Sequence, residues 1–209
     1  MSNTAENLMP IDVLDFWFDG SAKNPRAAAE RMSFWFQASD EADAAIKERF
    51  AECIEPAATG EYSSWGAKPH DCLALIILLD QFPRNLYRGT GEAFAHDALS
   101  LGLTVVGERL GYLDELSPVE QIFFLMPYQH VEDRERQHEG IALYNRLAES
   151  CPEPWRALAE GCRDFAQLHL DIIEQFGRFP HRNAALGRES TAEELKYLAD
   201  GAESFGQNQ

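Results

Sequence analysis

The sequence predicts an all-α fold made of stacked antiparallel helical hairpins. Apolar residues recur at helical spacing along most of the 209-residue chain. No stretch shows the strict apolar and polar alternation of a half-buried strand between hairpin turns. Short connections separate successive helical patterns, which makes neighbouring helices antiparallel. We therefore expect three helical pairs in a solenoid-like stack, with extra helices at both ends.

Three helices are predicted near the N-terminus. The first spans residues 11–18, and the second begins with Pro25 in its first turn and ends near Phe36. Ser39 or Asp40 caps the third helix. Its apolar residues recur every fourth position: Ala42, Ile46, Phe50 and Ile54. Its acidic residues are expected to form a solvated face: Asp43, Glu48, Glu52 and Glu55.

The next predicted helix is apolar nearly all round, which indicates a helix that runs through the core. It covers residues 71–80, and Phe82-Pro83 is expected to stop it, because proline lacks the N–H of a helical residue and disfavours helix in the residue before it. A further helix is predicted from about residue 92 to residue 110, ending at Gly111.

Capping signals mark the remaining helices. Residues 117–120, Ser-Pro-Val-Glu, form a capping box, and Pro127 is expected to disturb the helix that begins there. An amphipathic helix follows over residues 132–149, and another runs from residue 152 to Gly177. The final helix is capped by Ser190 or Thr191, with Glu193 or Glu194 completing the box.

Composition narrows the choice of partners. The chain has 18 Lys and Arg against 35 Asp and Glu, a net charge of −17, which disfavours nucleic acid and anionic membrane surfaces. Residues 1–10 show no signal peptide, and the longest apolar run, residues 73–79, is too short to span a bilayer. We expect a cytoplasmic protein with no nucleic-acid or membrane partner.

Four cysteines without metal-ligand spacing are predicted to be buried free thiols: Cys53, Cys72, Cys151 and Cys162. The tryptophans are expected in the core: Trp17, Trp35, Trp65 and Trp155.

Two similar stretches carry more polar residues than a turn requires. Residues 80–88 read D-Q-F-P-R-N-L-Y-R, and residues 177–188 read G-R-F-P-H-R-N-A-A-L-G-R. Each follows a long apolar helical pattern, so each is predicted to place an Arg-Asn pair in a tight turn at a helix end. A turn needs Gly, Pro or Asn, but it does not need several arginines and a histidine. If the two turns face each other, they build one site.

The first stretch suggests a clamp for an anion. Arg84 and Arg88 carry guanidinium groups, whose planar donors suit carboxylate or phosphate. Asp80 would orient an arginine, and Asn85 would lie in the turn. The alternative is structural, with Asp80 pairing with Arg84 only to close the helix end. Both interpretations stay open, because a structural helix end is common but one local acid cannot neutralise two arginines.

The second stretch concentrates positive charge. Its members are Arg178, His181, Arg182, Asn183 and Arg188. Mutual repulsion makes this group costly unless a bound anion, or carboxylates from elsewhere in the chain, offset the charge. The alternative interpretation is therefore a buried ion network with Asp80, Glu132 or Asp171.

His130 and Glu132 form a third candidate group. A histidine beside a carboxylate is typical of a general base or a metal site. The i, i+2 spacing and the lack of H-x-x-x-H and H-E-x-x-H argue against a metal. G-x-S-x-G, P-loop and G-x-G-x-x-G motifs are also missing, so no cofactor is predicted. His130 and His181 are the candidates for acid–base catalysis. The predicted ligand-binding residues are Asp80, Arg84, Asn85, Arg88, His130, Glu132, Arg178, His181, Arg182 and Asn183.

Several of these motifs resemble an uncharacterised bacterial family, catalogued as domain of unknown function 924. The similar segments are D-Q-F-P-R-N at 80–85, M-P-Y-Q-H-V-E at 126–132, F-G-R-F-P-H-R-N at 176–183, F-W-F at 16–18, W-F at 35–36 and L-G-R-E-S-T at 186–191. The resemblance implies a single all-α domain over residues 1–209 with a tetratricopeptide-like superhelix, and it implies no established activity. Val131 departs from the family pattern, in which a small polar residue is expected there.

Three functions remain open at this stage. The leading hypothesis is a binding module whose Arg, Asn and His residues hold a small anionic molecule or an acidic peptide terminus. The first alternative is a cofactor-independent enzyme with His130 or His181 as the proton carrier. The second is a structural scaffold without a ligand. An enclosed pocket would favour a metabolite or an enzyme, whereas an open groove would favour a peptide.

Overall fold

The described chain is built from helices. In the computed structural model, which describes residues 7–201 and residue 205, no strand occurs in those residues, and the all-α class is confirmed. The α-helices are α1 (Pro10–Phe18), α2 (Pro25–Phe36), α3 (Asp40–Phe50), α4 (Ile54–Thr59), α5 (Pro69–Ile76), α6 (Phe82–Leu86), α7 (Asp97–Arg109), α8 (Pro118–His130), α9 (Arg134–Ser150), α10 (Glu153–Phe176) and α11 (Ala192–Ala199). Shorter 3₁₀ turns are η2 (Ser21–Lys23), η3 (Ala51–Cys53), η4 (Ser63–Ala67), η6 (Gly91–Phe94), η7 (Tyr112–Glu115) and η8 (Pro180–Arg182). A π turn, η5 (Ile77–Gln81), joins α5 to α6.

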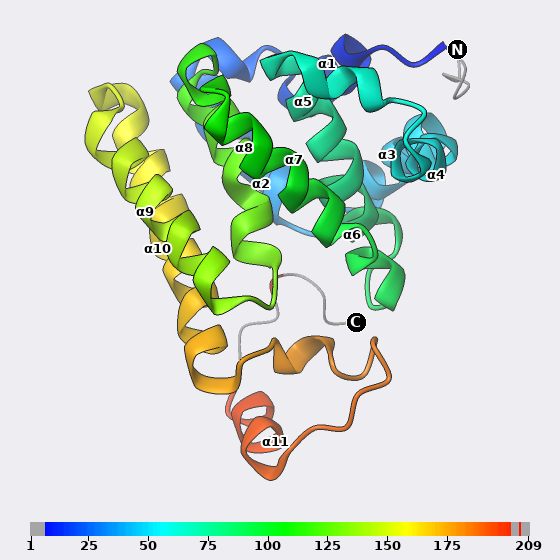
Figure 1. The fold of residues 1–209 in the computed structure, drawn as a ribbon, viewed down its shortest axis with the longest axis vertical. Coiled ribbons are helices and arrows are strands. Elements are labelled where there is room, and N and C mark those ends of the chain that lie inside the picture. The colour runs from blue at the N-terminus through cyan, green and yellow to red at the C-terminus, as the bar shows by residue number, and fades with distance from the viewer. Residues whose placement is uncertain (1–6, 202–204, 206–209) are drawn as a thin grey trace.

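Helices that follow each other in sequence pack side by side in the second half of the chain (Figure 1). There α7 packs on α8, α8 on α9, and α9 on α10. In the first half the contacts join more distant helices, because α1 packs on α5 and α3 packs on α6. Beyond η8, α11 lies at the end of the molecule opposite α1. The tetratricopeptide-like superhelix and the single domain stay predictions.

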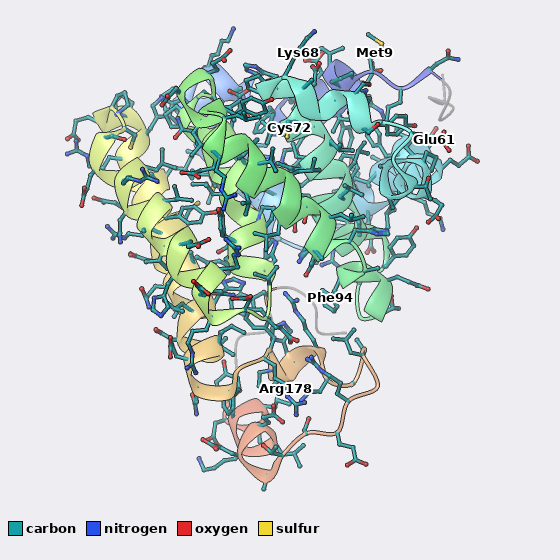
Figure 2. All side chains as sticks on the ribbon, viewed as in Figure 1. Met9, Glu61, Lys68, Cys72, Phe94 and Arg178 are labelled. Carbon is teal, nitrogen blue, oxygen red and sulfur yellow. The ribbon has the colours of Figure 1, made fainter. Side chains whose placement is uncertain are left out.

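An aromatic core connects α1, α2 and α8. Trp17 and Phe18 of α1 and Trp35 of α2 meet Phe123 of α8 edge to face, with ring centroids 5.4, 5.6 and 5.0 Å away. The four tryptophans are buried as predicted, and so are the four cysteines, all of which are free thiols. Figure 2 shows the side chains on this frame, with Phe94 projecting from η6 toward the segment that carries η8. None of the described helices is long and apolar enough to cross a membrane.

Most of the predicted helix ends are confirmed. The Ser39 hydroxyl accepts a hydrogen bond from the Ala42 N–H at 3.3 Å at the start of α3. At the start of α11, Thr191 and Glu194 cap each other's backbone N–H groups at 3.2 and 2.7 Å. Gly177 ends α10 with a φ of 69°, a left-handed conformation that glycine adopts without steric penalty.

Phe82-Pro83 does not stop its helix, and this prediction is wrong. The Phe82 N–H donates to the carbonyl of Ile77, so the chain forms the wider turn of a π-helix and continues to Leu86. The wider turn leaves Pro83 in the first turn of α6, where a missing N–H carries little penalty. Arg84 therefore lies on a helix that leads directly out of the core, rather than in a tight turn.

Two further helix predictions need correction. Pro127 lies inside α8, which continues to His130, because residues 122–130 are all buried and packing outweighs the one backbone bond that proline removes. The predicted helix over 92–110 is divided, since η6 ends at Phe94 and α7 begins at Asp97. This break sets the Asp97 carboxylate at the end of α7 that faces α6.

Candidate functional site

The two Phe-Pro stretches meet at a cavity of about 360 Å³ beside the end of α8. Three arginines line it: Arg84, Arg88 and Arg182. Three histidines line it as well: His130, His169 and His181. Aromatic side chains form much of the remaining wall, from Trp35, Phe36, Phe94, Phe165 and Phe205. Among the described residues, no aspartate or glutamate belongs to the wall.

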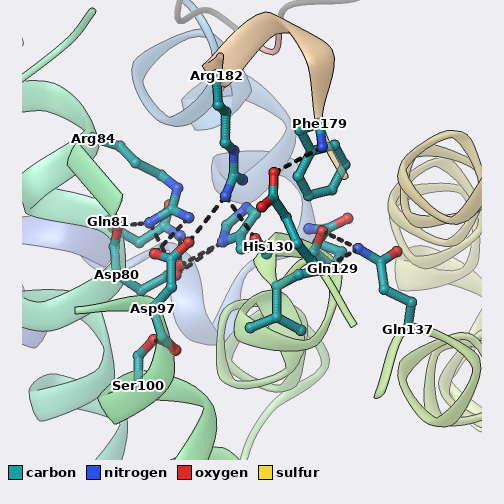
Figure 3. A network of polar contacts seen from close by, with 12 residues as sticks. Asp80, Gln81, Arg84, Asp97, Ser100, Gln129, His130, Gln137, Phe179 and Arg182 are labelled. Carbon is teal, nitrogen blue, oxygen red and sulfur yellow. Dashed lines mark hydrogen bonds and ion pairs between the residues drawn. The ribbon is translucent and has the colours of Figure 1, made fainter. Parts of the chain in front are cut away.

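Asp97 joins the arginines of the two stretches (Figure 3). Its carboxylate accepts a hydrogen bond from Arg84 Nη2 at 2.9 Å and another from Arg182 Nη1 at 3.2 Å. Arg84 comes from α6 and Arg182 from η8, so one carboxylate connects segments that are distant in sequence. Asp97 lies behind the two guanidinium groups as seen from the cavity, because the wall includes the arginines and not Asp97.

Asp80 is the second carboxylate behind the wall. Its side chain is 0% exposed, and it pairs with Arg84 Nη1 at 3.1 Å and with His130 Nδ1 at 2.9 Å. Burial alone would raise the pKa of Asp80, but Arg84 and His130 outweigh this effect and lower the pKa to about 2. Asp80 is therefore a carboxylate at neutral pH, and His130 must donate the proton on Nδ1.

Arg182 is held by aromatic rings as well as by hydrogen bonds. Its guanidinium carbon lies 4.3 Å from the ring centroid of Phe94 and 4.4 Å from that of Phe179. Nη1 donates to the carbonyl oxygen of His130 at 2.9 Å, whereas Nε has no hydrogen-bond partner among the described residues. Burial lowers the pKa of Arg182 to about 10 against the opposing effect of Asp97, so the side chain stays charged at neutral pH.

Asp43 of α3 is the third carboxylate behind the wall. The sequence places it on a solvated face, but its carboxylate accepts hydrogen bonds from Asn85 Nδ2 at 2.8 Å and from Arg88 Nη2 at 3.2 Å. The prediction is wrong because α3 packs on α6 and turns this one acidic residue inward. Glu48 and Glu52, farther along the same segment, are exposed as expected.

All three histidines of the wall are neutral at neutral pH. Burial lowers the pKa of His130, and the charge on Arg84 lowers it further. Burial and the neighbouring His130 hold the pKa of His169 well below its ordinary value. Burial and Arg182 lower the pKa of His181 to about 3. Each ring therefore offers a lone pair rather than a second N–H.

The hydrogen bonds assign the tautomers of two of these rings. His130 and His169 donate from Nδ1, to Asp80 and to the carbonyl of Phe165 at 2.9 Å, so Nε2 is the unprotonated nitrogen in both. Within the described part of the chain, neither Nε2 atom has a hydrogen-bond partner. Nδ1 of His181 is buried and also lacks a partner.

A second ion network lies outside the cavity. Arg178 binds Glu194 through two hydrogen bonds of 2.6 and 2.8 Å. Arg188 binds the Glu132 carboxylate with its two terminal nitrogens and donates from Nε to Asn183 at 3.0 Å. Of the predicted ligand-binding residues, Asp80, Glu132, Arg178 and Asn183 do not line the cavity. The contacts of Glu132, Arg178 and Asn183 agree with the alternative of a structural network.

The sequence suggests that the arginines of the two stretches lack enough carboxylate partners, and the structure corrects this prediction. The five arginines Arg84, Arg88, Arg178, Arg182 and Arg188 each contact at least one of the carboxylates Asp43, Asp80, Asp97, Glu132 and Glu194. Sequence reasoning proposed Asp80 and Glu132 as partners, but it missed Asp43, Asp97 and the role of Glu194. It also named Asp171, which instead accepts a hydrogen bond from Gln167 on the surface.

Metal ligation receives no support from this arrangement. Among the described residues, no group of three or more His, Cys, Asp and Glu side chains is placed to hold a metal ion. The chemistry available at the wall is therefore that of guanidinium donors, amides and neutral imidazoles.

Fold and cavity together define an all-α protein with a buried site of arginine and histidine. The chain belongs to the family described as bacterial protein of unknown function (DUF924), whose profile matches residues 13–202. It is similar to the solved structure of a protein of unknown function from Agrobacterium tumefaciens, with 34% sequence identity and a TM-score of 0.74. The match covers 92% of this chain and 97% of that one. The resemblance seen in the motifs is thus confirmed. No match was found among the curated proteins.

Proposed function

We propose that the protein binds a small anionic molecule in the cavity. The observation that carries this proposal is the placement of charge: three arginines line the wall, and their carboxylate partners Asp43, Asp80 and Asp97 do not. A carboxylate behind a guanidinium fixes the orientation of the guanidinium before a ligand binds, so that its positive potential is directed at the cavity.

The size of the cavity favours a small molecule over a peptide. Its volume of about 360 Å³ is at the lower end of the range for small-molecule sites, which is roughly 300–1,000 Å³. The aromatic part of the wall, which includes Phe36 and Phe165, suits an apolar or aromatic portion of the same ligand.

The four free cysteines support a reducing compartment, and we place the protein in the cytoplasm.

Binding can be tested with three simple anions: inorganic phosphate, acetate and benzoate. We expect at least one of them to raise the midpoint of thermal unfolding, and benzoate to exceed acetate if the aromatic wall contributes. At a ligand concentration of 100 times Kd the stabilisation is about 2.7 kcal/mol, or roughly 5–10 °C for a chain of this size.

Arg88→Gln and Arg188→Gln form a matched pair for this test. The side chain of Arg88 is 22% exposed and pairs with Asp43, which is 27% exposed; that of Arg188 is 25% exposed and pairs with Glu132, which is 24% exposed. Only Arg88 lines the cavity. Calorimetric titration should show about tenfold or greater loss of anion affinity in Arg88→Gln and no loss in Arg188→Gln. Equal losses, or no stabilisation of the native protein by any of the three anions, would leave the scaffold interpretation.

A further inference from the structure

The contact between Asp80 and His130 has a consequence beyond anion binding. Asp80 is a fully buried carboxylate that holds the proton of His130 on Nδ1. The two nitrogens of an imidazole point in different directions, so Nε2 is directed away from Asp80 and carries the lone pair. His130 lines the cavity, and within the described residues nothing hydrogen-bonds to its Nε2. A carboxylate that fixes the tautomer of a histidine in this way makes the other nitrogen a proton acceptor.

Imidazoles are the nucleophilic side chains of the described wall. Among the described residues that line the cavity there is no serine, threonine, cysteine, tyrosine or lysine. A covalent intermediate on a hydroxyl, a thiol or an amine of these residues therefore has no atom to form on. A proton acceptor at this place acts on a water molecule or on the bound molecule itself.

Positive charge is close to the proton acceptor. Arg84 and Arg182 both contact Asp97, and Arg182 also donates to the backbone carbonyl of His130. Guanidinium groups fixed beside a base stabilise negative charge that develops on an oxygen during a reaction. The cavity thus combines a base with an anion-stabilising group, which binding alone does not require.

We propose that the cavity is catalytic, with His130 as the general base that activates water to hydrolyse an ester of a small carboxylate-bearing acid. Asp80 is the positioning residue of this pair. The proposal rests on anion binding in the cavity, since the free carboxylate of the substrate is held by the arginines.

The reaction balances with water as the co-reactant. His130 Nε2 takes a proton from water while the water oxygen forms a bond to the acyl carbon. The π electron pair of the carbonyl group moves onto the carbonyl oxygen, which becomes an oxyanion. That oxyanion is stabilised by the guanidinium groups. When it collapses, the bond to the leaving alkoxide breaks, and the alkoxide takes the proton from Nε2. The products are the acid and the alcohol, and His130 is neutral again.

The groups that surround His130 set the pH range of this reaction. They come from five elements: Asp80 of η5, Arg84 of α6, Asp97 of α7, His169 of α10 and Arg182 of η8. Burial and Arg84 lower the pKa of His130 against the opposing effect of Asp80. We therefore expect a hydrolysis rate that is constant above pH 6.5 and falls only at lower pH.

The test uses two chromogenic esters, 4-nitrophenyl hydrogen succinate and 4-nitrophenyl acetate. Each rate is taken above that of the ester without protein, because the free carboxylate of the succinate ester attacks its own acyl carbon. After this subtraction the native protein should hydrolyse the anionic succinate faster than the neutral acetate. His130→Gln should lose about 100-fold or more of that rate, since general-base catalysis contributes roughly 10²–10⁴-fold. His138→Gln is the control, because His138 is an exposed histidine on α9 that pairs with Glu174. Imidazole added to a His130→Ala variant should restore part of the rate above that of the same imidazole without protein, which a purely structural role would not allow.

The experiment distinguishes a failure of the catalytic proposal from a failure of the binding proposal. If His130→Gln keeps its affinity for benzoate or phosphate and loses hydrolysis, both proposals are supported. Anion binding by the native protein, with hydrolysis no faster than in His130→Gln, overturns catalysis and leaves the binding function intact. If the His130 variants do not fold, the native pH profile decides: a rate that does not fall below pH 6.5 overturns the role of His130.

Discussion

At the scale of single residues, two arginines of the cavity wall are paired with carboxylates that are far away in sequence. Arg88 meets Asp43 and Arg182 meets Asp97, across 45 and 85 positions. An unpaired buried charge costs several kcal/mol, so such partners must exist in a stable fold. Sequence reasoning recognises the arginines by their local excess, but nothing near Asp43 or Asp97 in the sequence marks either as a partner.

Asp97 is the residue whose loss should matter most to this network. Replacing Asp97 with Asn removes the carboxylate shared by Arg84 and Arg182 and leaves two buried cations with one fewer anion. We expect the free energy of unfolding to fall by about 3–5 kcal/mol. Urea unfolding followed by circular dichroism measures this change. Glu30→Gln is the control, because it breaks an exposed pair in which the side chain of Arg26 is 88% exposed and that of Glu30 is 66% exposed. This change should lower the free energy of unfolding by less than about 1 kcal/mol. Similar losses in the two variants would contradict the buried network.

At the scale of helices, the sequence predicts where most of them begin and end, because caps and glycines act locally. Gly177 is correctly assigned for this reason, and Thr191 and Glu194 are among the residues that the sequence offers for the last cap. The π turn that continues α5 into α6 is not predictable in the same way, since proline in a helix pattern is ordinarily a stop signal. The tertiary packing that holds the turn becomes visible only in the structure. That turn directs Arg84 and Arg88 at the cavity.

Close helix packing leads to a prediction at Gly140, where α9 crosses α8. A Cβ atom at this position would lie 2.6 Å from Cβ of Tyr128, which is buried and close to its backbone. Gly140→Ala should therefore reduce the free energy of unfolding by about 1–3 kcal/mol through overpacking, despite the better helix propensity of alanine. Gly161→Ala on α10 is the control, because nothing lies within 4 Å of a Cβ atom there. It should stabilise by roughly 0.5–1 kcal/mol in the same urea titration. Stabilisation in both variants would show that α8 and α9 are not in close contact.

At the scale of the whole molecule, the cavity depends on segments from both halves of the chain. Trp35 and Phe36 come from α2, Arg84 from α6, His130 from α8 and Arg182 from η8. The sequence correctly predicts an all-α fold and points to six wall residues, Arg84, Asn85, Arg88, His130, His181 and Arg182. The predicted site leaves out His169 and the aromatic wall. Trp35, Phe36 and Phe165 follow ordinary core patterns, and the packing of α2 and α10 brings them and His169 to the cavity.

The three neutral histidines make the stability of the whole molecule depend on pH. The folded-state pKa values of His130, His169 and His181 lie below the ordinary value of 6.5, so the unfolded chain binds more protons at mildly acidic pH. The free energy of unfolding should therefore fall as the pH drops below 6.5, by up to about 1.4 kcal/mol per pH unit for each histidine. Asp80, with a pKa of about 2, contributes stability that is present above about pH 4 and is lost only below it. Urea unfolding between pH 7 and 5 isolates the histidines, and His169→Gln should reduce the slope by about one proton. A slope that is the same in His169→Gln and in the native protein would show that His169 is not held neutral in the fold.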